Sequence, residues 1–120
     1  MKKDIAEKWV AALRSGDYKQ GNPGFLADDK GYCCLGVLCE VLGEEKTMNF
    51  KEQMYEFGEC KSFGVLSENQ RDMAGMVSTT GYRKRKTALY QLNDRGETGE
   101  HRRWSFSEIA DVIEKEWEDL

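Results

Sequence analysis

The sequence has few of the residues on which catalytic and metal sites commonly depend. Its 120 residues include one histidine, His101, and one proline, Pro23. No apolar run approaches the ~20 residues of a membrane span, and the first residues form no apolar signal-peptide core. The Walker pattern of phosphate-binding loops is also absent. We therefore expect a protein without a membrane segment that stays in the cytosol, with its four cysteines as reduced thiols.

Length and composition limit both the fold and the partners. A chain of 120 residues has room for one domain, residues 1–120, and at 39% hydrophobic and 33% charged residues its core is expected to be small. The formal net charge is -4. This balance disfavours general binding to nucleic acids, which depends on neutralising phosphates. A local basic site is still compatible with it, because charge can be distributed unevenly along the chain.

The apolar run Tyr32–Leu42 is the segment around which the chain is organised. Its leucines share one face of a helix, and Gly36 inside that helix predicts the close approach of a neighbouring segment. Apolar residues at helical spacing predict a second helix over Asp4–Arg14, with Asp4 as its N-cap. Capping boxes predict helices that start at Ser67 and Ser105.

The remaining segments predict short elements. Gly31 favours a hairpin turn over 28–31, residues 54–57 alternate weakly as a strand, and Thr87 is expected to cap a short helix over 88–93. Together the patterns predict an α+β domain of about four helices, two of them short, with a short β-hairpin or small antiparallel sheet.

The cysteines are the first candidates for chemistry. Cys33 lies near a predicted helix start, where the helix dipole lowers the pKa of a thiol, and a cysteine hydrolase acting through Cys33 and His101 is one hypothesis. The competing interpretation is that the thiols are buried and inert. A zinc site would draw on Cys33, Cys34, Cys39, Cys60 and His101. Their spacing does not match the paired ligands of structural zinc sites, so we predict no metal and no cofactor.

Two polar regions are better candidates for binding. The first comprises two basic clusters with interleaved aromatic residues, and its candidate ligand-binding residues are Tyr82, Arg83, Arg85, Lys86, Arg102, Arg103 and Trp104. Guanidinium groups beside aromatic faces suit phosphates and bases. The alternative is a solvated loop that balances an acidic protein. The second region is a glycine-bounded turn that carries Arg14, Lys19 and Gln20, since loops on a rigid scaffold often bind ligands.

The chain also resembles a group of small uncharacterised proteins from tailed phages and prophages. Five blocks carry the resemblance in order: Trp9–Gly16, Tyr18–Gly21, Tyr32–Cys39, Leu92–Gly96 and Ser105–Glu114. The segments 83–86 and 97–103 depart from it and look like insertions. The resemblance implies no settled activity, but it implies a phage setting in the cytosol of a bacterial host. If the family shares a site, the Arg14–Gln20 turn is favoured over the insertions.

These observations favour a non-enzymatic phage accessory protein that binds a small anionic ligand. A nucleotide that signals host immunity, sequestered in an anti-defence role, fits the basic and aromatic loops, and such a binder is often a homo-oligomer. The alternative is a protein–protein interaction module that inhibits a host protein through its acidic C-terminal helix or its basic loop. A cysteine hydrolase comes third.

Overall fold

The computed structural model describes residues 1–59 and 64–120, which form five α-helices, a short 3₁₀ helix and two separate two-stranded antiparallel sheets. The helices are α1 (Lys3–Arg14), α2 (Cys34–Val41), α3 (Glu68–Ala74), α4 (Leu89–Asp94) and α5 (Phe106–Glu116), and the 3₁₀ helix is Trp117–Asp119. The strands are β1 (Ala27–Asp28), β2 (Gly31–Tyr32), β3 (Lys46–Asn49) and β4 (Met54–Phe57). The predicted α+β class is confirmed.

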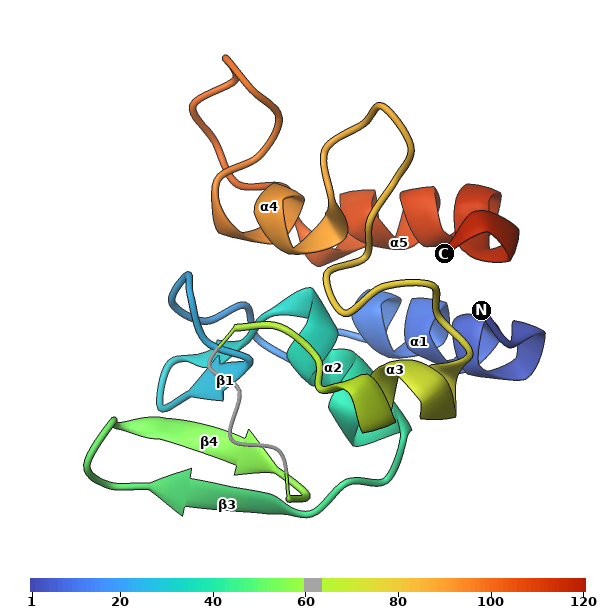
Figure 1. Ribbon diagram of the computed structural model, residues 1–120. Coiled ribbons are helices and arrows are strands. Elements are labelled where there is room, and N and C mark those ends of the chain that lie inside the picture. The colour runs from blue at the N-terminus through green and yellow to red at the C-terminus, as the bar shows by residue number, and fades with distance from the viewer. Residues whose placement is uncertain (60–63) are drawn as a thin grey trace.

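Helix α2 is the buried centre of the domain, as the apolar run predicts. It lies between the hairpins on one side and α4 with α5 on the other (Figure 1). Every residue of α2 from Cys34 to Cys39 is buried. A Cβ on Gly36 would overlap the backbone carbonyl of Leu26, so the expected close approach is confirmed. The indole of Trp9 in α1 donates to the carbonyl of Cys34 at 2.8 Å and fixes α1 against this centre.

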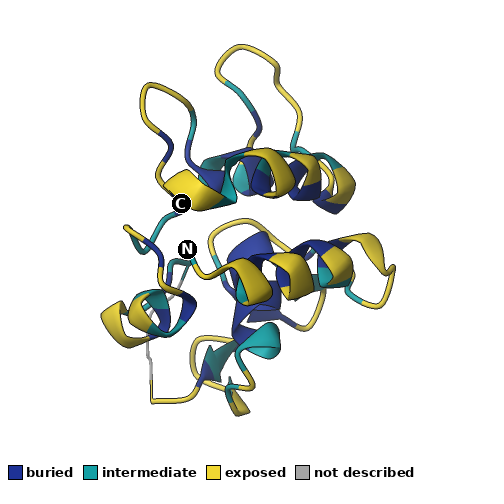
Figure 2. Cartoon of the chain, turned by 90° about the vertical axis from the view of Figure 1, so that its right-hand side faces the viewer, coloured by how far each residue is buried: buried dark blue, intermediate teal, exposed yellow. Residues whose placement is uncertain are grey.

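Helix α5 packs over α1, and each helix has one exposed face and one buried face (Figure 2). The buried residues of α1 are Ala6, Trp9, Val10 and Leu13, and those of α5 are Phe106, Ile109, Ala110 and Ile113. Trp117, the first residue of the 3₁₀ helix that follows α5, is half-buried. The spacing of these stripes follows the helical period, so the sequence determines which faces meet.

The helix caps are partly as predicted. Ser67 and Ser105 each cap a helix, and Gln70 and Glu108 complete the two capping boxes. The expected caps Asp4 and Thr87 are wrong, since α1 begins after Lys2 and α4 begins after Ala88. Asp4 instead lies in the first turn of α1, where a carboxylate also complements the helix dipole.

In Figure 1 the β1–β2 hairpin lies to the left of α2, and the β3–β4 hairpin lies below it. The first is the predicted hairpin, with Ala27 opposite Tyr32 and Asp28 opposite Gly31. The buried carboxylate of Asp28 accepts from the backbone of Lys30 and Gly31 and thereby closes the turn. The predicted strand at 54–57 is confirmed as β4, but its partner β3 was not predicted. Among the described residues, no helix combines the length and apolar character needed to cross a bilayer.

Candidate ligand-binding site

Helix α4 carries the two basic loops, one before it (82–87) and one after it (95–103). Both loops rise from the same side of the domain (Figure 1). The first is closed by a backbone hydrogen bond from Lys86 to Arg83 at 3.0 Å, and the second by one from Trp104 to Leu92 at 2.9 Å. The loops are therefore two ordered arms on one short helix.

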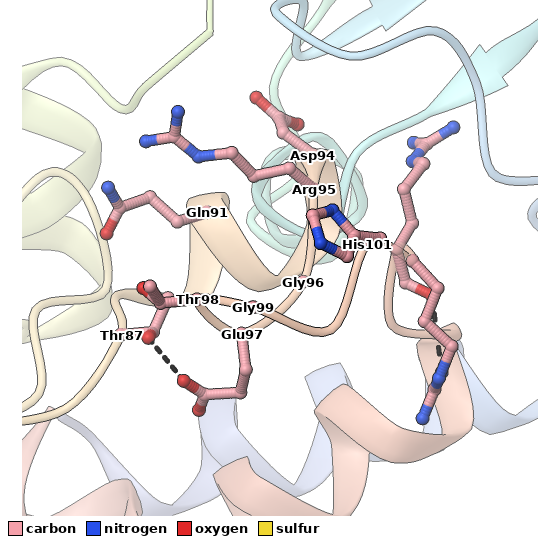
Figure 3. A pocket seen from close by; sticks show the side chains of 11 residues that line it. Thr87, Gln91, Asp94, Arg95, Gly96, Glu97, Thr98, Gly99 and His101 are labelled. Carbon is pink, nitrogen blue, oxygen red and sulfur yellow. Dashed lines mark hydrogen bonds between the residues drawn. The ribbon is translucent and has the colours of Figure 1, made fainter.

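The 95–103 loop encloses an open hollow of about 710 Å³, here called the α4 hollow. Its lining is polar and includes Gln91, Asp94, Arg95, Glu97, His101, Arg102 and Arg103. Figure 3 shows Gln91 and Arg95 side by side, His101 next to them, and Thr87 and Glu97 below, joined by a hydrogen bond. That bond runs from the Thr87 hydroxyl to the Glu97 carboxylate at 2.5 Å. The volume lies within the ~300–1,000 Å³ typical of small-molecule sites.

A second open hollow of about 610 Å³ lies beside the first and is here called the Tyr82 hollow. It is lined by Tyr82, Arg83, Arg85, Lys86, Thr87 and Glu97. Thr87 and Glu97 line both hollows, so their hydrogen bond forms the ridge between them. The two basic clusters of the sequence thus flank one surface.

Two of the predicted binding residues are engaged in holding the 82–87 loop on α5. The Arg83 side chain is only 7% exposed and donates to the Glu116 carboxylate at 2.8 Å and to the Thr87 carbonyl at 3.0 Å. Lys86 reaches the same carboxylate at 3.3 Å. The hydrogen bonds from Arg83 lower the pKa of Glu116 and keep it ionised. Arg83 is therefore an anchor of the loop.

The 95–103 loop is fixed by a second ion pair. Arg102 forms a two-bond contact with Glu108, at 2.9 and 2.8 Å. This contact, together with the backbone donor of Ser105, lowers the pKa of Glu108 to about 2. The Trp104 indole donates to Glu100 at 2.7 Å, which bends the loop back on itself.

Other cations in the two hollows remain available to a ligand. Within the described residues, the side chains of Arg85 and Arg95 make no hydrogen bond or ion pair, and both are exposed. Arg103 donates through Nε to the Asn93 carbonyl at 2.8 Å, while its Nη2 is buried and has no partner among the described groups. A buried donor without a partner is costly in free energy, so Arg103 is the least satisfied of the described polar side chains at this site.

Asn93 is the polar centre beneath this site, and it was not among the residues predicted from the sequence. It is fully buried, and its side-chain oxygen accepts from the Cys34 backbone at 3.2 Å and from Gln20 at 3.0 Å. Gln20 also donates to the Trp104 carbonyl at 2.9 Å. Asn93 lies in the Leu92–Gly96 block, directly before Asp94, where the apolar face of the helix becomes polar. That position is the sequence signal that could have identified it.

The structure separates the residues of the predicted Arg14–Gln20 turn. Gln20 lies beneath the site, where its amide donates to the carbonyls of Asn93 and Trp104. Its side chain therefore holds the loop in place and does not face either hollow. Arg14 lies on the α1–α5 face, where Asp111 and Glu114 accept from it at 2.7 Å each and raise its pKa. Among the described residues, neither hollow is lined by Arg14, Lys19 or Gln20, and Lys19 is exposed.

The cysteines belong to the core. Cys33 is 2% exposed and caps α2 by accepting from the Gly36 backbone at 3.3 Å. Burial raises the pKa of its thiol to about 12, because desolvation of the thiolate outweighs the lowering by the backbone N–H groups at the start of the helix. His101 lies in the exposed 95–103 loop. In the parts of the chain that the structure describes, no three His, Cys, Asp or Glu residues gather as a metal site, and Cys60 lies outside them.

Comparison with known proteins identifies a family. A family model described as a domain of unknown function (DUF8296) matches residues 1–117. Neither the curated proteins nor the solved structures give a match.

Proposed function

Since the chain belongs to the DUF8296 family, whose function is unknown, we propose from its geometry that it is a non-enzymatic protein that binds a small anionic ligand. The observation that carries this proposal is the α4 hollow, in which Arg95 is unpaired and the Nη2 of Arg103 is buried without an acceptor. A phosphate oxygen would satisfy the exposed Arg95 guanidinium, because guanidinium forks match the geometry of phosphates.

The balance of charges in the site supports a modest, selective anion binder. Arg83 and Lys86 share the single carboxylate of Glu116, and Arg102 pairs with Glu108, so these cations contribute less to the net attraction of an anion. The attraction comes mainly from Arg85, Arg95 and Arg103, and the carboxylates of Asp94 and Glu97 in the linings oppose it. Such a site would hold a small phosphorylated molecule, and the overall negative charge would disfavour long nucleic acids.

The cysteine chemistry that would support an enzyme is unfavourable here. A nucleophilic thiol must be ionised and accessible, whereas the pKa of Cys33 is raised to about 12 and its side chain is buried. This argues for the binding role over the hydrolase hypothesis.

The finer proposal concerns the ligand and its setting. The resemblance to small phage and prophage proteins suggests a role in the cytosol of an infected bacterium. A nucleotide immune signal is the ligand that this setting and the basic, aromatic-flanked hollows favour together. The protein would then remove the signal by holding it, without altering it.

A depletion experiment tests this function. Purified protein is incubated with a panel of cyclic nucleotides and ADP-ribose derivatives, and the free ligand is measured by liquid chromatography after ultrafiltration. We expect one member to be depleted and to return intact after heat denaturation. The control is Lys8→Ala, a change at an exposed position of α1. Retention of no member would refute the proposal, and recovery of a cleaved product would favour an enzyme.

One observation favours a second candidate, the interaction module. Phe50 at the tip of the β3–β4 hairpin is 86% exposed, and a large apolar side chain in that position suits a protein contact. Recovery of a stoichiometric host protein that is lost with Phe50→Ser would support this role.

A further inference from the structure

The α4 hollow and the Tyr82 hollow are two halves of one divided surface. Each has its own volume and its own basic residues, and Thr87 and Glu97 are common to both linings. The ridge between them carries the Glu97 carboxylate, held in place by the Thr87 hydroxyl. The middle of the surface therefore carries a carboxylate, and each hollow beside it contains an exposed arginine, with Asp94 as a second carboxylate in the α4 hollow.

Each flank retains a cation that no described group neutralises. Arg95 lines the α4 hollow and Arg85 lines the Tyr82 hollow. Arg85 takes the left-handed conformation, with φ of 59°, at the turn closed by the Arg83–Lys86 backbone contact. A non-glycine residue in this conformation is uncommon, and it holds the exposed guanidinium at the tip of an anchored loop.

From this arrangement we infer that the ligand carries two anionic groups separated by an uncharged spacer, one group in each hollow. This rests on the proposed anion-binding function and names the class of ligand within it. The spacer crosses the ridge, where Thr87 and Glu97 offer hydrogen-bonding oxygens. A phosphate centred on the ridge would face the Glu97 carboxylate, so a compact anion occupies one hollow only.

The division has a measurable consequence for affinity. Joining two anionic groups makes the second contact intramolecular, so a two-group ligand binds more tightly than either group alone. Loss of a charge-assisted contact worth ~1.5–3 kcal/mol corresponds to roughly 10- to 100-fold in affinity. Variants in either hollow should thus lower the affinity for the two-group ligand, whereas the affinity for a one-group ligand should change with variants in one hollow only.

Isothermal titration of the full chain with defined probes tests the inference. The probes are adenosine 5′-monophosphate, with one phosphate, and 5′-phosphorylated diadenylate, whose two phosphates flank a nucleoside. The variants are Arg85→Gln and Arg95→Gln, which change exposed side chains and should leave the thermal midpoint unchanged. Lys8→Ala on α1 serves as the charge-loss control.

The expected result is that the diadenylate binds at least about tenfold more tightly than the monophosphate. Arg85→Gln and Arg95→Gln should each remove most of that advantage, and Lys8→Ala should not. Equal affinity for the two probes, or sensitivity to only one of the two arginines, would overturn the inference and leave the proposed function standing. If neither these probes nor the nucleotide panel bind, both fall.

Discussion

Replacing Asn93 with alanine should destabilise the protein by about 2–4 kcal/mol. The Asn93 side chain is fully buried, and its oxygen is the acceptor for the Cys34 backbone donor in the first turn of α2. A buried donor left without an acceptor costs ~1–3 kcal/mol. Gln20 would lose its hydrogen bond to the Asn93 side chain but keep the one to the Trp104 carbonyl at 2.9 Å. The loss of the Gln20 contact therefore contributes less to the destabilisation, about 1 kcal/mol.

Urea unfolding followed by far-ultraviolet circular dichroism measures this loss. Asn69→Ala is the matched control, since Asn69 is exposed on α3, and it should change the unfolding free energy by less than about 0.5 kcal/mol. A double-mutant cycle with Gln20→Ala should show a coupling of about 0.5–1.5 kcal/mol. A change of under about 0.5 kcal/mol for Asn93→Ala, or strict additivity with Gln20→Ala, would refute the role assigned to Asn93.

Three further predictions concern packing, pH and thiol reactivity. Gly36→Ala should lower the unfolding free energy by at least about 2 kcal/mol, because the new Cβ meets the Leu26 carbonyl; a wild-type urea midpoint would contradict the packing. The carboxyl of Glu108 should titrate near pH 2 by NMR, since Arg102 lowers its folded pKa below the unfolded value, and Arg102→Ala should raise that pKa. The ion pair between Arg102 and Glu108 stabilises the fold above the unfolded pKa of Glu108, and this stabilisation is lost as the pH falls toward 2. A Glu108 titration at the unshifted pKa would exclude this ion pair in solution. Cys33, with a pKa of about 12, should react with iodoacetamide only after unfolding, and rapid labelling of the native protein would show that it is accessible.

Local sequence signals predicted the fold best where the signal and its structural effect lie within one or two turns. The capping boxes at Ser67 and Ser105 are correct because both partners lie three residues apart. Strand β3 was missed for the opposite reason. Its residues Lys46–Asn49 lack an apolar alternation, and the strand exists through its pairing with β4.

The sequence predicted some residues of the candidate site, but not the pairing that decides their roles. The run of cations after Tyr82 correctly located a basic surface, yet the sequence cannot show that Arg83 is paired with Glu116, 33 residues away. Gln20 was chosen as a loop residue that binds a ligand, and the structure gives it a supporting contact to Asn93. Distant partners decide which charges are available, and such pairing is a property of the folded chain.

The packing of α5 over α1 also has a consequence for how the chain folds during synthesis. Its two surface ion pairs join residues 97 and 100 positions apart, so this contact is among the last that a growing chain can make. At ~5–20 residues per second, the 92 residues from Arg14 to Phe106 take roughly 5–20 s to translate. Throughout that interval the part of α1 that faces α5 is uncovered, whereas Trp9 can already pack against α2. We therefore expect α1 to pack on α2 first and on α5 only after α5 has left the ribosome.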